Sequence, residues 1–294
     1  MSLLDFQRRF SDEADCLCYL MDIRSIRGFR CPQCKSADIG TIATRHLLQC
    51  KTCRRQFSVT SGTCFHGTRT TLLEWFWAIF LVAKDKRGHS ALQLSKELGI
   101  PYARAWFILQ KLKVAMGWRE SQYRLSGIVE LDEAYFGTPD RDGGKGWRTR
   151  KAKAFVAVSV TDEGKPRFAK MKIASRLDGR YVLKFASQEI EPGSIVRTDG
   201  LTIYNPLAAR YVHKPIVAKG KDKDAVLKWV HTVISNAKAF IDGTFHGLGE
   251  KHLQRYLDEF CYRFNRRHKE DELFDRLLLA CVDAPPKTYD ELTE

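Results

Sequence analysis

Two pairs of closely spaced cysteines constrain the fold of this chain more than any other feature. Cys31-Pro-Gln-Cys34 is followed, after 15 residues, by Cys50-Lys-Thr-Cys53. Two C-x-x-C turns at this separation supply four thiolates, a full tetrahedral set for Zn²⁺. A unit of fewer than about 40 residues has too small a core to fold alone, so the metal would hold it together. The pattern predicts a zinc ribbon with Cys31, Cys34, Cys50 and Cys53 as ligands, and a redox pair is the less favoured alternative.

The remaining cysteines and the apolar segments indicate the compartment. Nine cysteines without a secretory signal before residue 30 favour a reducing environment. The longest apolar run, Trp75–Ala83, is less than half of the roughly 20 residues that a membrane span needs. We therefore expect a cytoplasmic, nucleoid-associated protein with no membrane partner. Five cysteines lack a partner spacing and are expected to be buried packing residues: Cys16, Cys18, Cys64, Cys261 and Cys281.

The charge balance indicates a polyanionic partner. The 294 residues include 49 Lys and Arg against 35 Asp and Glu, a formal net charge of +14. A basic protein of this kind commonly binds nucleic acid. Residues 1–126 hold 20 basic and 10 acidic groups, so most of the excess lies there. With 44% hydrophobic residues the chain has a globular composition, which excludes a disordered protein.

Residues 90–117 have the pattern of a helix-turn-helix. Ser90 can cap a first helix with Leu92 on its inward face, Gly99 supplies the turn, and Pro101 can begin a second helix. The second helix of such a motif enters the major groove of DNA. The residues expected to contact DNA are Tyr102, Arg104, Lys111 and Lys113. The alternative is a three-helix packing unit whose basic face is only solvated.

From Gly127 the pattern changes to alternating strands and helices, which predicts an α/β domain with a mixed sheet flanked by helices. Strands are expected at 127–136, 154–161, 167–174, 194–198 and 211–217, and helices at 178–190, 224–241 and 249–267. The acidic segment 283–294 contains two prolines and is expected to fray. The predicted organisation is a lead-in helix and zinc ribbon at 1–60, a helix-turn-helix region at 61–126, a catalytic domain at 127–282 and the acidic tail.

Two aspartates stand at corresponding places of neighbouring expected strands. Period-two alternation puts Glu130 and Asp132 on one face of the first strand and Glu133 on the other. Asp199 stands at the end of the expected strand 194–198, just before Gly200, which allows a sharp turn. Two such carboxylates can bridge a pair of divalent cations about 4 Å apart, which activate water and stabilise the leaving oxygen of a phosphodiester. The sequence therefore predicts a metal-dependent nuclease site at Asp132 and Asp199.

Several motifs together resemble bacterial insertion-sequence transposases of the ISXO-two-like type. The resemblance covers roughly residues 10–282. Its motifs are the zinc ribbon, Gly62–Phe65, the Trp75–Trp77 helix, Val129–Gly137, Arg197–Gly200, Ser235–Lys238, Gly243–His246, Tyr256–Phe260 and Arg263–Arg267. It implies a ribonuclease-H-like fold and a DDE-type reaction that cleaves and transfers DNA strands with Mg²⁺ or Mn²⁺. The site residues that it implies are Asp132, Asp199, Asn236, Lys238, Glu259, Arg263 and Arg266, with Asp132, Asp199 and Asn236 as metal ligands.

One position departs from the wider DDE superfamily. The third acidic residue is replaced by Asn236, 36 residues after Asp199, and an amide oxygen brings no charge to a metal. Glu259 is the other candidate, since it shares a helix face with Arg263 and Arg266 at spacings i, i+4 and i+7. A surface salt-bridge ladder would have the same spacing. His231 is expected to be an ordinary structural histidine.

The leading hypothesis is a transposase that binds the terminal inverted repeats of its element and joins them to target DNA. In the expected reaction, water hydrolyses the element end and the freed 3′ hydroxyl attacks target DNA. Since two ends must be processed, we expect a homo-oligomer on DNA. The alternative is a DNA-binding regulator on a catalytically inactive transposase scaffold.

Overall fold

The computed structural model describes residues 1–42, 45, 47–137, 151–217, 227–245 and 248–294. His246 of the Gly243–His246 motif lies outside these residues. The chain forms two compact units: the first comprises Met1–Met116 with His268–Glu294, and the second comprises Gly117–Arg267. Within the described residues, no helix has the length and apolar character to span a membrane.

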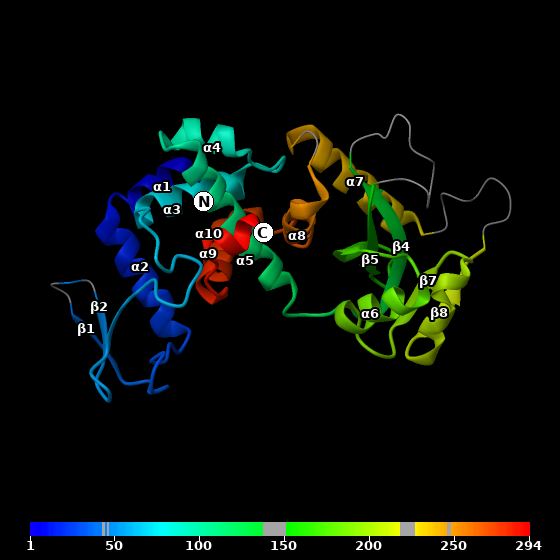
Figure 1. Cartoon of the computed structure of the whole chain (residues 1–294), viewed down its shortest axis with the longest axis horizontal. Helices are drawn as coiled ribbons and strands as arrows, with labels where there is room; N and C mark the ends of the chain where they lie inside the picture. The colour runs from blue at the N-terminus through cyan, green and yellow to red at the C-terminus, as the bar shows by residue number, and fades with distance from the viewer. Residues whose placement is uncertain (43–44, 46, 138–150, 218–226, 246–247) are drawn as a thin grey trace. The chain divides into compact units, whose positions relative to one another are not determined.

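The first unit is helical around an aromatic core, with a small sheet at the cysteine pairs (Figure 1). Rings of Phe6, Phe10 and Phe76 pack against Phe274, with centroid distances from 5.5 to 5.9 Å. Its elements are α1 (Leu3–Arg9), α2 (Glu13–Ile26), β1 (Ile39–Ile42), β2 (Leu47–Cys50), β3 (Gln56–Ser58), α3 (Leu72–Lys84), α4 (Ala91–Leu98), α5 (Tyr102–Glu120, which ends in the second unit), η5 (Glu270–Glu272), α9 (Leu273–Asp283) and α10 (Tyr289–Thr293).

The C-terminal segment belongs to this first unit, which corrects two expectations. Residues 268–282, assigned above to the catalytic domain, join the N-terminal helices because the apolar face of α9 packs on α3. The segment 283–294 does not fray. Its helix α10 has a Thr288–Glu291 capping box, and Leu292 is only 1% exposed. The Tyr289 ring lies 6.0 Å from Trp106 and 5.8 Å from Phe107 of α5, so α10 is a packed part of the unit.

The second unit contains a five-stranded sheet in the order β6-β5-β4-β7-β8. Strands β4, β5 and β6 are antiparallel, whereas β7 and β8 run parallel to β4. Three antiparallel strands continued by parallel strands give the ribonuclease-H-like arrangement expected from the resemblance. The strands are β4 (Ile128–Phe136), β5 (Ala152–Val160), β6 (Pro166–Ala174), β7 (Ile195–Thr198) and β8 (Val212–Pro215).

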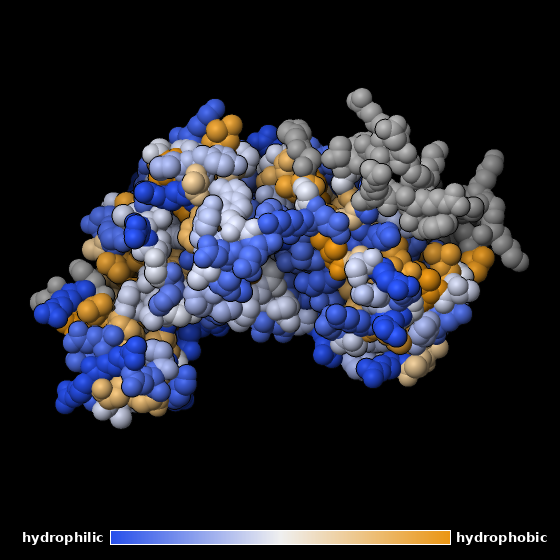
Figure 2. All heavy atoms as spheres, in the orientation of Figure 1, coloured by the Kyte–Doolittle hydropathy of each residue, from blue (hydrophilic) through white to orange (hydrophobic). Residues whose placement is uncertain are grey.

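Helices cover both faces of this sheet (Figure 1). On one face α7 (Lys228–Phe245) and α8 (Glu250–Phe264) pack over β4, β5 and β6 around Val156, Val158 and Leu257. On the other, α6 (Gly179–Glu189) and η3 (Thr202–Ala209) pack over Val129 and Leu131. The apolar residues are thus inside, and most of the surface in view is hydrophilic (Figure 2).

The outer edge of β6 is closed by side-chain amides of α8. Gln254 accepts a hydrogen bond from Ile173 N (2.8 Å) and donates to Met171 O (3.0 Å). Asn265, just after α8, accepts from Ala169 N (2.6 Å) and donates to Ala169 O (3.0 Å). Each amide thereby offers the donor and acceptor that a further strand would provide, so the edge is protected from pairing with another chain.

Candidate catalytic centre and metal ribbon

Asp132 lies in β4, and Asp199 directly follows β7, the parallel neighbour of β4. The pairing of the two strands ends at Glu130 and Arg197, each two residues before one of the aspartates, and the Asp199 carboxylate is near enough to raise the pKa of Asp132. Neighbouring strands are about 4.8 Å apart, so the two carboxylates project from adjacent positions. Asp199 follows the last residue of β7, where its Oδ1 accepts a hydrogen bond from Leu201 N (3.0 Å).

The three acidic residues of β4 have different partners. Glu130 Oε2 accepts hydrogen bonds from Trp229 N and Val230 N, both 2.9 Å, in the first turn of α7. Asp132, on the same face, contacts α7 through its Oδ2, while Glu133 on the opposite face accepts from Tyr204 Oη (2.5 Å) in η3. Glu130 therefore fixes the position of the start of α7 on the sheet, and Glu133 fixes the position of η3.

The electrostatics of the centre favour a positive ligand. Burial raises the pKa of Asp132, and the neighbouring Asp199 carboxylate raises it further, whereas Glu133 N–H and His231 lower it. Burial also raises the pKa of Glu133, with added repulsion from Asp132 and Asp199. Carboxylates that repel one another in a partly buried site are stabilised by a bound cation.

Helix α7 brings His231 to this centre. His231 Nε2 lies 3.1 Å from Asp132 Oδ2, so His231 faces the centre. Lys238 lies seven residues, or about two turns, further along the same helix face. Asn236, predicted from the resemblance as a metal ligand, is exposed on α7. It lies five residues from His231, which corresponds to about 140° around the helix.

The predicted Glu259, Arg263 and Arg266 group divides between two sets of contacts. Glu259 is 0% exposed and accepts from Arg263 Nε (3.0 Å) and Nη2 (2.7 Å). Arg266 instead pairs with Glu120 Oε1 at 2.5 Å. The helix that carries Glu259 packs on β6, and β5 separates β6 from the strand of Asp132. The i, i+4, i+7 spacing of these three residues therefore reflects buried ion pairs and not a surface salt-bridge ladder.

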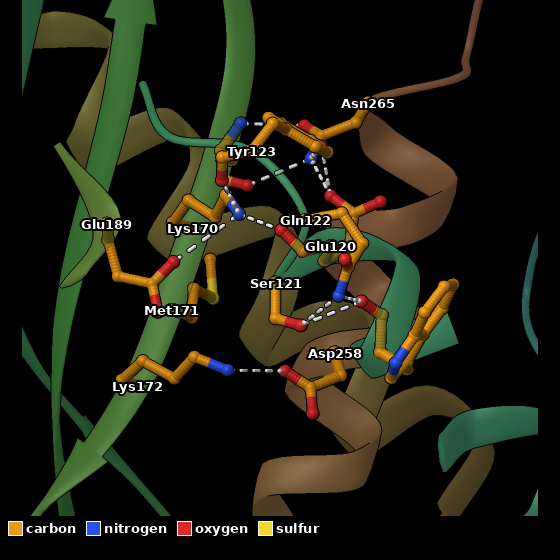
Figure 3. Close-up of polar contacts among 12 residues, drawn as sticks. Glu120, Ser121, Gln122, Tyr123, Lys170, Met171, Lys172, Glu189, Asp258 and Asn265 are labelled. Carbon is orange, nitrogen blue, oxygen red and sulfur yellow. Dashed lines mark hydrogen bonds and ion pairs between the residues drawn. The ribbon is translucent and has the colours of Figure 1, made fainter. Parts of the chain in front are cut away.

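Glu120 is the centre of a buried polar network (Figure 3). Besides Arg266, its carboxylate accepts from Asn265 Nδ2 (2.5 Å) and from the Tyr123 hydroxyl. Lys170 of β6 donates to the carbonyl oxygens of Glu120 and Tyr123 and pairs with Glu189 at 3.3 Å. The network fixes the last turn of α5 to the sheet. The spacing of Glu259, Arg263 and Arg266 in the sequence could not have indicated these partners.

The four cysteines of the ribbon converge as predicted. The Sγ atoms of Cys31, Cys34, Cys50 and Cys53 all lie within 4.8 Å of one another. The N–H of Cys53 lowers the pKa of Cys50 to about 6, and the N–H of Cys34 lowers that of Cys31, so thiolates are favoured at these two positions. The Ser36 N–H lowers the pKa of Cys34, but the neighbouring Cys50, together with burial and the other two thiols, outweighs it and raises that pKa to about 12. A tetrahedral Zn²⁺ fits this donor set. Of the other cysteines, Cys18 is exposed, contrary to expectation, and the remaining four are buried.

Residues 91–120 form two helices joined by a short turn, but their surface differs from that of the predicted helix-turn-helix. Ser90 caps α4, and Gly99 adopts a left-handed conformation (φ 63°) before α5. Leu92, expected inside, is 56% exposed, because Leu94 occupies the inward position. The structure also corrects the expected position of two basic residues on α5: Lys111 and Lys113 are each 2% exposed.

Packing within the first unit explains this burial. Lys111 Nζ donates to Cys64 O (2.8 Å) and lies 4.9 Å from the Phe107 ring centroid. The first turn of α5 is open to solvent: Tyr102 is 56% exposed, and Arg104 pairs with Glu74 at 3.5 Å while remaining partly exposed. Of the four predicted DNA contacts, Tyr102 and Arg104 are thus on the surface.

Two family models match this chain. Residues 124–265 match the ISXO2-like transposase domain, and residues 11–56 match the transposase zinc-ribbon domain. The chain is a transposase with a zinc ribbon and an ISXO2-like transposase domain. A protein of Halobacterium salinarum, described as an uncharacterized protein in transposable element ISH50, is 27% identical to this transposase over 203 residues. The match covers 64% of this chain and 67% of the relative.

Solved structures with detectable similarity include two complexes of the Mos1 transposase. The paired-end complex with the left transposon end is 12% identical, with 74% of this transposase and 81% of that chain covered and a TM-score of 0.29. The strand transfer complex is 13% identical, with 74% and 79% covered and a TM-score of 0.29. The fold assignment of this transposase rests instead on its own strand order.

Proposed function

We propose that this transposase uses Asp132 and Asp199 as the paired carboxylates of a DDE-type centre that cleaves and transfers DNA strands. The observation that supports the proposal is the parallel pairing of β4 and β7 in a ribonuclease-H-like sheet, which, continued by two residues, would bring Asp132 level with Asp199. Burial raises the pKa of Asp132, and the charge of Asp199 adds to that shift. Such a pair is suited to divalent cations.

Mg²⁺ or Mn²⁺ fits this donor set, because both ions prefer carboxylate oxygens. Bound ions supply an activated water and stabilise negative charge on the phosphodiester. The chain's own residues hold the carboxylates in place. Glu133 N–H donates to Asp132 Oδ1 (2.9 Å), and Leu201 N–H donates to Asp199 Oδ1 (3.0 Å). Lys238, on the α7 face of His231, can pair with a phosphate of the bound strand.

DNA binding is proposed for the first unit, through the first turn of α5. The N-terminal residues of a recognition helix contact base edges, and Tyr102 and Arg104 are the predicted contacts that lie on the surface. The substrate would be the terminal inverted repeats of the element, followed by target DNA. A homo-oligomer on DNA remains our expectation, because two ends must be cleaved together.

The test compares Asp132→Asn and Asp199→Asn with the unaltered chain on supercoiled DNA that carries the element ends, in Mg²⁺. Each change keeps the side-chain size and removes a charge, so strand cleavage should fall by at least about a hundredfold while end binding persists. Glu163→Gln, an exposed acid paired with Lys165, is the matched control and should cleave normally. Full cleavage by either aspartate variant would refute the assignment, and an inactive but DNA-binding parent chain would favour the regulator.

A further inference from the structure

The pairing of β4 with β7 does not by itself set the distance between Asp132 and Asp199. This pairing stops at Glu130 and Arg197, two residues before the aspartates. Beyond that point Asp132 continues in β4, whereas Asp199 has left β7 and lies in the segment that leads to η3. Two cations about 4 Å apart need both carboxylates at a fixed separation. Contacts beyond the paired part of the strands therefore have to hold the two aspartates together.

A series of four hydrogen bonds connects the two carboxylates. Asp199 Oδ1 accepts from Leu201 N (3.0 Å), and Leu201 O accepts from Tyr204 N (3.2 Å) in η3. The Tyr204 hydroxyl donates to Glu133 Oε2 (2.5 Å), and Glu133 N donates to Asp132 Oδ1 (2.9 Å). Three of these bonds join residues at most three positions apart in the chain. The bond between Tyr204 and Glu133 joins residues 71 positions apart, so it ties the segment after β7 to β4.

Tyr204 is itself firmly held and out of reach of any substrate. Its side chain is fully buried, in the core that includes Leu131 of β4 and Leu207 of η3. Burial and the Glu133 carboxylate raise the pKa of the hydroxyl, which therefore keeps its proton and donates. A buried ring does not touch DNA, so any effect of Tyr204 on the centre passes through the residues that it holds.

We propose that Tyr204 is a positioning residue of the catalytic centre, whose hydrogen bond to Glu133 holds the segment carrying Asp199 at a fixed distance from Asp132. The inference rests on the proposed function of the two aspartates, and it adds a residue that the sequence patterns did not indicate. Without this bond, the segment after β7 gains freedom, and the centre spends less time at the spacing that binds cations. Apparent metal affinity falls in proportion to that fraction of time.

The experiment compares Tyr204→Phe with Tyr211→Phe in the full chain, with Mn²⁺ binding measured by electron paramagnetic resonance. Both changes keep a buried ring and remove its hydroxyl. Tyr211 is the matched control, because it belongs to the same core and its hydroxyl donates to Ile190 O (3.5 Å). It precedes β8, beside the start of β7, whereas Asp199 follows the end of β7. Tyr204→Phe should weaken Mn²⁺ binding by about 10- to 100-fold, and Tyr211→Phe by less than about twofold.

Strand cleavage provides a second readout that a general loss of structure would not reproduce. In Tyr204→Phe the Mn²⁺ concentration for half-maximal cleavage should rise by the same factor as the dissociation constant. Cleavage at saturating Mn²⁺ should return close to the parental rate, because bound cations restore the spacing of the carboxylates. A partly unfolded chain would instead cleave slowly at every Mn²⁺ concentration.

A double variant keeps the test valid if Tyr204→Phe folds poorly. Tyr204→Phe combined with Glu133→Met replaces both partners by apolar groups, so neither is left as an unpaired buried polar group. The double variant should need no more Mn²⁺ than Glu133→Met alone, because both changes remove the same hydrogen bond. Additive losses would reject Glu133 as the link between Tyr204 and the centre.

Parental Mn²⁺ affinity in Tyr204→Phe would overturn the inference, as would an equal loss in Tyr211→Phe. Cleavage by Tyr204→Phe that stays low at saturating Mn²⁺ would also reject the positioning role. Asp132→Asn separates this failure from that of the proposed function. If Asp132→Asn loses Mn²⁺ binding while Tyr204→Phe does not, only the role of Tyr204 is rejected. If Asp132→Asn binds Mn²⁺ and cleaves normally, the centre itself is wrongly placed.

Discussion

Single residues in this transposase show how burial decides what a charged side chain does. Arg104 and Lys111 are both basic and both on α5, seven residues apart. Arg104 is partly exposed beside Glu74, whereas Lys111 is buried with its ammonium group on Cys64 O. Desolvation lowers the pKa of Lys111, as expected for a buried cation. Substitution of Arg104 should therefore affect DNA binding, whereas substitution of Lys111 should affect stability.

Arg104→Ala should weaken binding to element ends and reduce the slope of log affinity against log salt by about one, with an unchanged melting temperature. Lys111→Ala should lower the free energy of unfolding by about 1–3 kcal/mol, because it removes a buried hydrogen bond and leaves a cavity. Binding titrations at several salt concentrations test the first prediction, and chemical denaturation of both variants tests the second. Unchanged end binding by Arg104→Ala would move DNA recognition away from the first turn of α5.

At the scale of elements, α8 performs two structural tasks in addition to forming the core. Its Gln254, with Asn265 beyond its end, closes the edge of β6. Asn265 also donates to Glu120 and Tyr123, so that the end of α5 is attached at the same point. Much of the Arg263–Arg267 motif thus has a structural explanation in the packing of α8.

Asn265→Ala should lower the free energy of unfolding by about 1–3 kcal/mol, because the N–H and C=O of Ala169 lose their partner in a partly buried edge. The exposed edge should also promote self-association, measurable as larger species in analytical ultracentrifugation. Gln188→Ala, at an exposed amide on α6, is the control and should change neither quantity. Parental stability and mass for Asn265→Ala would show that the amides do not protect the edge.

The zinc ribbon is an element whose strands are too short to be stable alone. Strands β1, β2 and β3 have only three or four residues each. Arg24 of α2 supports them through hydrogen bonds to Val59 O (2.5 Å) and Ser61 O (2.7 Å). The metal must supply most of the remaining stability.

Metal analysis should therefore return about one Zn²⁺ per chain, and Cys34→Ser should lose it. Proteolysis should then cut near residues 30–58 in Cys34→Ser but not in Cys18→Ser, which alters an exposed cysteine outside the cluster. A protease-resistant ribbon after complete chelation would refute a structural metal.

At the scale of the whole molecule, the two ends of the chain fold into the same unit. The first unit is assembled from residues 1–116 and 268–294, with the entire second unit inserted between them in sequence. Its core depends on rings from both segments, such as Phe6 and Phe274 at 5.5 Å. The C-terminal helices are therefore needed for the fold of the first unit.

Leu292→Ala should lower the free energy of unfolding by about 2–4 kcal/mol, since it opens a cavity under α10. Ile26→Ala is the control, because Ile26 is 84% exposed in the same unit. Differential scanning calorimetry of the full chain measures both changes. A parental transition for Leu292→Ala would mean that α10 is not part of the cooperative core.

The sequence by itself determined the features that depend on short-range spacing. The C-x-x-C pairs set the four ribbon ligands, because two residues of separation bring both thiolates of a turn to one point. Strand alternation placed Glu130 and Asp132 on one face and Glu133 on the other, because successive side chains of a strand point to opposite faces. The strand order of the ribonuclease-H-like domain came from the family resemblance and not from spacing.

Only the tertiary structure decided which of the charged residues meet. Glu120 and Arg266 are 146 residues apart, and Lys111 and Cys64 are 47 apart, so no local pattern relates them. The same is true of His231 and Asp132, whose contact depends on how α7 is set on the sheet by Glu130. Periodicity assigns a residue to a face of a helix. Which neighbour covers that face, and so whether a charge is solvated, paired or placed at a metal site, depends on packing between elements distant in sequence.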